Sequence, residues 1–130
     1  MIVVDSSALI AIVLDEPEAE RFSDAVGGDD APHASAFTLF ETRTVLSFRG
    51  GSARLRQFQH WLDTAKLVSV AFDEQQSVLA LDAYRHWGKG NHPAGLNLGD
   101  CVSYALARTL NAPLLFKGED FARTDVRRAL

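Results

Sequence analysis

Short apolar runs separated by longer helical patterns make up most of this chain. Residues 2–4, 67–72 and 114–116 are rich in aliphatic and aromatic side chains, which is typical of strands buried inside a parallel sheet. Residues 126–130 are the candidate for a last short strand. Helical patterns lie between these runs, over residues 8–14, 16–26, 36–48, 53–65, 73–87 and 98–110. The alternation predicts an α/β sandwich of three layers, with helices flanking a central, mainly parallel sheet.

The helix expected over residues 36–48 carries an unusual carboxylate. Its large apolar side chains recur at helical spacing and share one broad face, which we expect to be buried: Phe37, Phe40, Val45 and Phe48. Glu41 lies on this side, one turn from Phe37 and one turn from Val45. An isolated carboxylate there is costly unless something compensates its charge. Glu41 is therefore either a salt-bridged or solvent-reaching side chain, or part of a metal site or shared acidic pocket.

Length and composition limit the class of protein. A chain of 130 residues with 47% hydrophobic and 23% charged residues is ordinary for a globular domain, which excludes disorder, collagen and coiled coil. No linker or repeat divides the chain, so residues 1–130 are expected to form a single domain. One cysteine excludes an internal disulfide framework and a cysteine-based zinc cluster. No stretch approaches the ~18 apolar residues of a membrane span, and the first residues do not resemble a signal peptide. We therefore expect a cytoplasmic protein.

Charge is unevenly distributed along the chain. The net charge of −4 argues against a protein that coats nucleic acid nonspecifically. Residues 1–42 carry a net charge of −8, residues 43–92 one of +3 and residues 93–130 one of +1. Four arginines of the middle segment bracket a Gly-Gly turn: Arg43, Arg49, Arg54 and Arg56. These arginines either contact phosphates beside an acidic pocket or solvate an exposed helical hairpin.

Three carboxylates are expected at one edge of the sheet. Asp5 directly follows the first strand and Asp120 lies just beyond the strand at 114–116, so both belong to the carboxyl edge, where ligands bind in such sheets. Asp100 sits in the first turn of a helix that begins at the same edge, because helices in this fold run antiparallel to the strands. Each residue also has a structural interpretation: Asp5 as a helix cap, Asp100 as a partner of the helix dipole, and Asp120 as a turn residue.

Together with Glu41, these acids would form a site made only of oxygen ligands. Such a set suits Mg²⁺ or Mn²⁺, whereas Zn²⁺ would favour His or Cys. A cation would offset the repulsion among clustered carboxylates. Asp5 and Asp100 are the acids best placed by strand end and helix start, so we expect them to bind the metal directly. Phosphoryl transfer and phosphodiester hydrolysis are the usual reactions at such sites.

Three stretches carry a resemblance to the VapC toxin branch of the PIN-domain family, and the resemblance covers essentially the whole chain. The opening IVVDSSAL at residues 2–9 resembles the family's strand, Asp and Ser/Thr motif. The most specific stretch runs through GKG, HPA and LNLGDC between residues 88 and 101. The pattern closes with LLFKGEDF at 114–121, followed by Thr124-Asp125.

This resemblance implies a Mg²⁺-dependent endoribonuclease on a parallel sheet of about five short strands. The catalytic residues that it implies, position by position, are Asp5, Glu41, Asp100 and Asp120. Many relatives carry the fourth acid two residues before the Asp-Phe pair, where this chain has Gly118. Asp120 is therefore expected to take that role, and the alternatives are Glu119 or a site of three acids. The resemblance also implies a cognate VapB antitoxin, transfer or ribosomal RNA as substrate, and a homodimer.

Two other classes remain open from the residues alone. A signalling receiver domain also has an acidic Mg²⁺ pocket, for which Asp5, Asp73 and Lys117 would serve. Three helical segments between the first two clear strands disfavour it, and so do Glu41 and Asp100, which it leaves unexplained. The other class is a catalytically inactive α/β binding module. No Gly-x-Gly-x-x-Gly follows the first strand, so a dinucleotide site is not supported.

The loop rich in Gly and Pro before residue 98 holds polar side chains near the expected site. Lys89, His92 and Asn97 lie in this loop. A cation there would hold a substrate phosphate, while the alternative is a surface loop whose glycines only turn the chain. Trp61 and Trp87 fall at helical apolar spacing, which favours core packing over base stacking.

Overall fold

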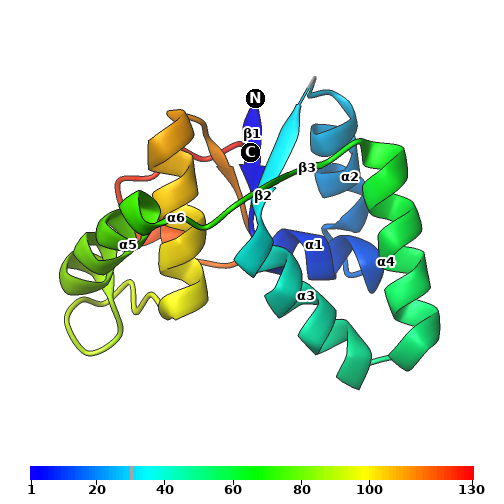
Figure 1. The fold of residues 1–130 in the computed structure, drawn as a ribbon, viewed down its shortest axis with the longest axis horizontal. Helices are drawn as coiled ribbons and strands as arrows, with labels where there is room; N and C mark the ends of the chain where they lie inside the picture. The colour runs from blue at the N-terminus through cyan, green and yellow to red at the C-terminus, as the bar shows by residue number, and fades with distance from the viewer. Residues whose placement is uncertain (30) are drawn as a thin grey trace.

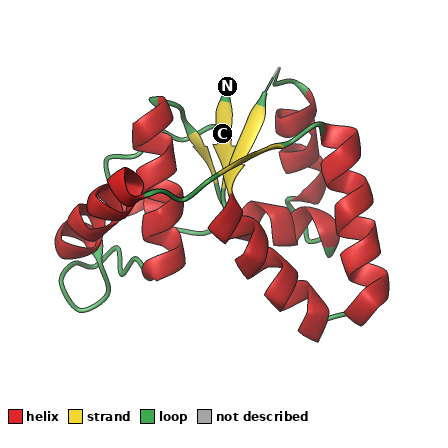
Figure 2. Cartoon of the chain, in the orientation of Figure 1, coloured by secondary structure: helices red, strands yellow, loops and turns green. Residues whose placement is uncertain are grey.

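The computed structural model describes residues 1–29 and 31–130, and its centre is a parallel sheet. The strands are β1 (Ile2–Val4), β2 (Pro32–Ser35), β3 (Val68–Val70) and β4 (Leu114–Leu115). Their order is β3-β2-β1-β4, and every pairing between them is parallel (Figure 2). The predicted α/β class and parallel sheet are thus confirmed.

The sheet differs from the prediction in two strands. The sequence pattern did not indicate β2, whose residues Pro32, His33, Ala34 and Ser35 include only one aliphatic side chain. The candidate strand at 126–130 forms a single bridge, between Leu114 and Arg128, and no extended ladder. The described residues therefore form four strands instead of about five.

Six α-helices and one short 3-10 helix complete the described part of the chain. They are α1 (Ser6–Val13), α2 (Ala19–Gly27), α3 (Ala36–Phe48), α4 (Gly51–Ala65), α5 (Glu74–Trp87), α6 (Leu98–Leu110) and η1 (Phe121–Arg123). Side-chain caps start four of them, because Asp5, Ser35, Asp73 and Asn97 each accept a hydrogen bond from a backbone N–H of the first turn. Within the described residues, no helix is long and apolar enough to cross a bilayer.

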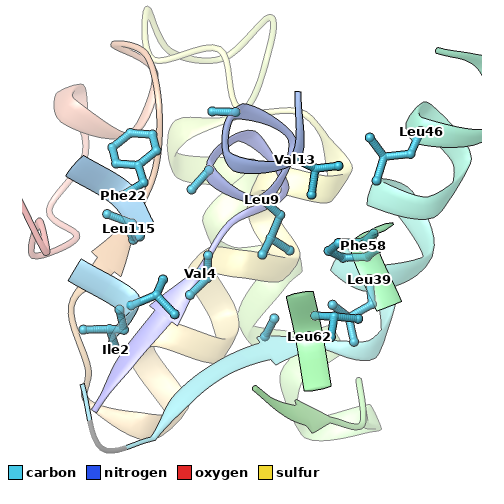
Figure 3. Packing of buried hydrophobic residues seen from close by; sticks show 14 residues of the cluster. Ile2, Val4, Leu9, Val13, Phe22, Leu39, Leu46, Phe58, Leu62 and Leu115 are labelled. Atoms are coloured by element: carbon cyan, nitrogen blue, oxygen red, sulfur yellow. The ribbon is translucent and has the colours of Figure 1, made fainter. Parts of the chain in front are cut away.

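The sheet separates two hydrophobic cores, which gives the predicted three layers (Figure 1). Alternate residues of β1 face opposite sides: Ile2 and Val4 join the core beneath α1 to α4, and Val3 joins the core beneath α5 and α6. Figure 3 shows Phe22 beside Leu115 of β4 on one side of the first core, and Leu39, Phe58 and Leu62 grouped on its other side. Both faces of β1 are thus covered, as expected for a strand inside a parallel sheet. The edge strand β3 differs from the buried strand predicted over residues 67–72, because Val68 and Ser69 are exposed.

The buried face of α3 is not the one that the phenylalanine spacing predicted. Phe40 and Phe48 are largely exposed, and Phe37 is 37% exposed. The buried side chains are Thr38, Leu39, Thr42 and Leu46. The two threonines are compatible with burial because their hydroxyls have partners: Thr42 donates to the Thr38 carbonyl at 2.8 Å, and Thr38 lies 3.3 Å from the Ser103 hydroxyl. Leu39 and Leu46 supply the apolar burial on this face, and hydroxyl pairing, which spacing does not reveal, makes the burial of the two threonines tolerable.

Candidate active site

Asp5 is held rigidly where β1 ends and α1 begins. Only 1% of its surface is exposed. One carboxylate oxygen accepts from the Ser7 backbone N–H at 3.0 Å and from the Ser7 hydroxyl at 2.6 Å, while the other accepts from the Ser103 hydroxyl at 2.6 Å. Asp5 is therefore a helix cap, as one interpretation held. Asp5 also lies at the carboxyl edge of the sheet, so the helix cap and the predicted place at the ligand-binding edge belong to the same residue.

Asp100 lies at the start of α6, opposite Asp5. Its backbone N–H donates to the Asn97 side chain at 2.8 Å, and its carboxylate accepts from the Asn97 backbone N–H at 3.0 Å, which makes a capping box. Burial raises the pKa of this carboxyl group to about 7, and the nearby charge of Asp5 adds to the rise. The hydrogen bond from the Asn97 backbone lowers the pKa of Asp100, and the charges of Asp120 and Glu41 raise it further. Asp100 is thus close enough for the charges of all three other predicted acids to affect its pKa.

Glu41 reaches the site because α3 packs against a glycine of α6. A Cβ atom built on Gly99 would lie 2.8 Å from Cδ and from Oε1 of Glu41, and nearer still to Oε2. The carboxylate therefore occupies the space that a side chain at position 99 would fill. Burial raises the pKa of Glu41, a hydrogen bond with Ser6 lowers it, and the charge of Asp5 raises it. Glu41 belongs to the acidic pocket and not to a surface ion pair.

Asp120 is the most exposed of the four acids. It precedes η1, and its charge contributes to the raised pKa of Asp100. Glu119 instead lines a hollow together with Lys117 and Arg128. This segment is not extended, because Gly118 has φ of +98° and Asp120 is in the helical region. The chain turns at Gly118, and Asp120 lies near enough to Asp100 for its charge to raise the pKa of that group.

The donor set suits a hard divalent cation, although it is not a closed cage. Four carboxylates converge from the end of β1, the second turn of α3, the start of α6 and the segment after β4, and their mutual repulsion favours a cation between them. In residues 1–29 and 31–130, no three His, Cys, Asp or Glu side chains are already spaced to hold a metal ion. Closing such a site therefore requires the less constrained carboxylates to rotate toward Asp5.

Comparison with known proteins agrees with this arrangement. The family model of the PIN domain matches residues 2–127. The chain belongs to the PIN-domain family. This PIN domain is 48% identical to "Ribonuclease VapC" of Mycolicibacterium smegmatis over 124 residues, which cover 95% of this chain and 96% of the relative. The VapC relatives and the fold confirm the VapC resemblance.

Solved structures show the same fold. The crystal structure of Mycobacterium tuberculosis VapC20, described as a sarcin-ricin loop cleaving toxin, has a TM-score of 0.79 at 16% identity and covers 97% of this chain and 96% of its own. VapBC2 from Rickettsia felis, bound to a DNA fragment from its promoter, has a TM-score of 0.77 at 13% identity and covers 98% and 96%. Family membership removes the receiver interpretation. Two residues that the receiver interpretation used, Asp73 and Lys117, have structural roles in this PIN domain. Asp73 caps α5, and Lys117 forms ion pairs with Glu16 and Glu18.

Two polar side chains of the loop before α6 make structural contacts. His92 accepts from the Ala94 backbone N–H at 3.0 Å, and its ring lies 4.8 Å from that of Trp87. Asn97 caps α6, and Lys89 is exposed. Trp61 and Trp87 pack against the two cores, as predicted.

Sequence reasoning missed the residues that position the acids. Ser103 holds Asp5 from 98 positions away, and it follows Asp100 by one helical turn, which was the available signal. Ser7 both donates to Asp5 and accepts from the Lys117 backbone N–H at 3.0 Å, so it ties the end of β1 to the segment after β4. Gly99 had no signal at all, since its importance lies in the missing side chain.

Proposed function

We propose that this PIN domain is a metal-dependent endoribonuclease of the VapC type, the toxin of a VapBC toxin–antitoxin system. The observation that carries the proposal is the convergence of Asp5, Glu41, Asp100 and Asp120 at the carboxyl edge of a parallel sheet. The 48% identity to a VapC ribonuclease over nearly the whole chain supports the same activity. In this proposal residues 1–130 act as one domain.

The four acids have different parts in the proposed reaction. Asp5 and Asp100 would hold a divalent cation, Mg²⁺ in our proposal with Mn²⁺ as a substitute. A bound cation of this kind activates water and stabilises charge on the phosphate. Asp5 is fixed in advance by three hydrogen bonds, so its position costs no reorganisation. Asp100 holds a proton up to about pH 7 and must release it for its oxygens to become strong ligands.

Glu41 and Asp120 flank this pair. The raised pKa of Glu41 suits a group that accepts a proton from the attacking water. Asp120 lies at the exposed rim, where it can orient that water or the substrate. Asp120 therefore remains our choice for the fourth acid, with Glu119 outside the pocket.

A circular RNA tests the proposal, because it has no ends for an exonuclease to attack. The purified chain should linearise the circle with Mg²⁺ and stop when EDTA is in excess. Cutting that persists in EDTA would contradict metal dependence, and an intact circle with Mg²⁺ or Mn²⁺ would contradict the activity. An inactive binding module would give the second result.

The partners of this chain are part of the proposal. The fold shared with VapBC2 supports a VapB antitoxin, and the product of a neighbouring reading frame should block RNA cleavage when added at an equal amount. Transfer or ribosomal RNA is the proposed substrate and the cytoplasm the proposed site of action. Sequencing the new RNA ends in cells after induction would show which RNA is cut.

We also propose a homodimer. An apolar cleft of about 500 Å³ lies between α3, α5 and α6, and Phe37, Phe72, Leu81 and Leu98 line it. Exposed apolar surface of this kind is typical of protein contacts. Sedimentation velocity should show a dimer that Leu81→Asp converts to a monomer, whereas a monomeric wild-type chain would contradict the proposal.

A further inference from the structure

The outer face of α3 links the acidic site to an aromatic side chain well outside it. Phe48 is 86% exposed and Phe40 is 65% exposed. With 3.6 residues per turn, Phe48 lies two turns beyond Glu41 on the same face of the helix, roughly 10 Å farther along its axis. Thr44, also exposed, fills the turn between them. Any extended ligand that leaves the site along α3 therefore meets Phe48.

The end of α3 is also the most basic part of the chain. Residues 42–62 contain four arginines and neither Asp nor Glu, although the whole chain has a net charge of −4. Figure 1 shows that α3 and α4 form a hairpin that projects away from the carboxyl end of the sheet. A basic projection next to an acidic pocket is suited to a polyanion that reaches a metal site.

Two of these arginines stabilise the hairpin and two are left for a ligand. Arg43 donates to Gln59 at 3.3 Å, and Arg54 donates to the Val13 carbonyl at 3.0 Å. Arg49 and Arg56 are exposed, and in residues 1–29 and 31–130 no hydrogen bond or ion pair involves their side chains. Arg49 directly follows Phe48, so an exposed ring and a guanidinium group are both carried at the tip of the hairpin.

We propose that Phe40, Phe48 and Arg49, here called the α3 strip, bind single-stranded RNA next to the phosphodiester that is cut. The rings stack on bases and Arg49 contacts a phosphate, the combination by which proteins hold single strands. This inference rests on the proposed function and names the residues that position its substrate. Charge favours RNA over a second copy of the chain, because a symmetric contact through this tip would bring arginines of both copies together.

The test measures RNA affinity and cleavage separately. The probe is a single-stranded RNA 12-mer of mixed sequence with a 5′-fluorescein label. Anisotropy gives its Kd with Mg²⁺ present, in the full chain carrying Asp100→Asn to prevent cleavage. Phe48→Ala should weaken binding roughly 5- to 100-fold, the range for losing one stacked base. Arg49→Gln should reduce the slope of log K against log salt by about 0.7, the value for one phosphate contact on a single strand.

Cleavage by the otherwise wild-type chain distinguishes positioning from chemistry. Phe48→Ala should raise KM by a similar factor and leave kcat within about twofold. Phe48→Trp, which keeps a stacking ring, should restore KM. Matched controls on α5 are Val78→Ala and Arg85→Gln, two exposed positions outside the strip, and they should change neither quantity.

Each result decides the inference. Wild-type cleavage with unchanged KM and Kd in Phe48→Ala and Arg49→Gln overturns the α3 strip and leaves the proposed function intact. Unchanged RNA affinity together with a shift in sedimentation coefficient overturns it as well, and assigns the face to a protein contact. A wild-type chain that neither binds nor cuts RNA overturns the proposed function and the inference with it.

Discussion

Replacing Gly99 by Ala should displace the Glu41 carboxylate without harming the fold. The added Cβ would lie 2.8 Å from Cδ and Oε1 of Glu41, whereas ordinary contacts begin at 3.4 Å. The carboxylate must therefore retreat by at least about 0.6 Å, which rotation of this flexible side chain permits. Misplacing a reacting group by about 1 Å can cost roughly 10²-fold in rate. We expect Gly99→Ala to slow single-turnover RNA cleavage by about 10- to 100-fold.

The free energy of unfolding of Gly99→Ala should rise or stay constant while its cleavage rate falls. Alanine is favoured over glycine inside a helix by roughly 0.5–1 kcal/mol, so the free energy of unfolding should not fall. Gly27→Ala in α2 is the matched control, because nothing lies within 4 Å of the Cβ it adds, and it should leave the rate unchanged. Urea unfolding and single-turnover cleavage are measured on both variants.

Two results would refute this reasoning. Gly99→Ala with the wild-type rate would show that the position of the Glu41 carboxylate is irrelevant to cleavage. A full rate loss on adding Gly99→Ala to a Glu41→Gln chain would show that the glycine acts through something other than Glu41, since the two changes should be strongly non-additive.

Three further predictions follow from the same geometry. Ser103→Ala removes a donor from the buried Asp5 carboxylate and should lower the free energy of unfolding by about 1–3 kcal/mol in urea; an unchanged value would mean that another donor replaces Ser103. In metal-free protein, folded Asp100 keeps its proton up to about pH 7 instead of its ordinary 3.8, so stability should fall as pH rises from about 4 to 7, by on the order of 1–3 kcal/mol after solvent screening. Asp100→Asn should flatten that pH dependence, and an equally steep curve in this variant would assign it to other groups. Asp120→Asn should slow single-turnover cleavage by roughly 10²-fold and Glu119→Gln should be nearly silent; the reverse ranking would move the fourth acid to Glu119.

The sequence predicted the parts of the site that local chemistry determines. The β-branched run before Asp5 marks both the strand and its end, and residue types typical of helix starts mark the beginning of α6 near Asp100. These signals depend only on neighbours in the chain. The three-layer fold follows from the same alternation of strands and helices, together with the VapC motifs.

The features that depend on distant packing could not be predicted in this way. β2 begins with a proline and contains only one aliphatic residue, so its sequence carries no strand signal although Pro32 and Ala34 are buried in the fold. The inward face of α3 carries Leu39 and Leu46 together with two hydrogen-bonded threonines, and not the phenylalanines. The apolar phenylalanine face on which the sequence placed Glu41 is exposed, and the space for its carboxylate is provided by Gly99, a feature that the spacing does not reveal.

The most direct test of the central claim is the single-turnover rate of RNA cleavage as a function of Mg²⁺ concentration, measured for metal-stripped wild type and for Asp100→Asn. The acidic site predicts no cleavage without added metal, a rate that rises and saturates with Mg²⁺ in the wild type, and no cleavage at any Mg²⁺ concentration in Asp100→Asn. A wild-type rate that is independent of Mg²⁺, or an Asp100→Asn chain that cuts RNA as fast as the wild type, would contradict it.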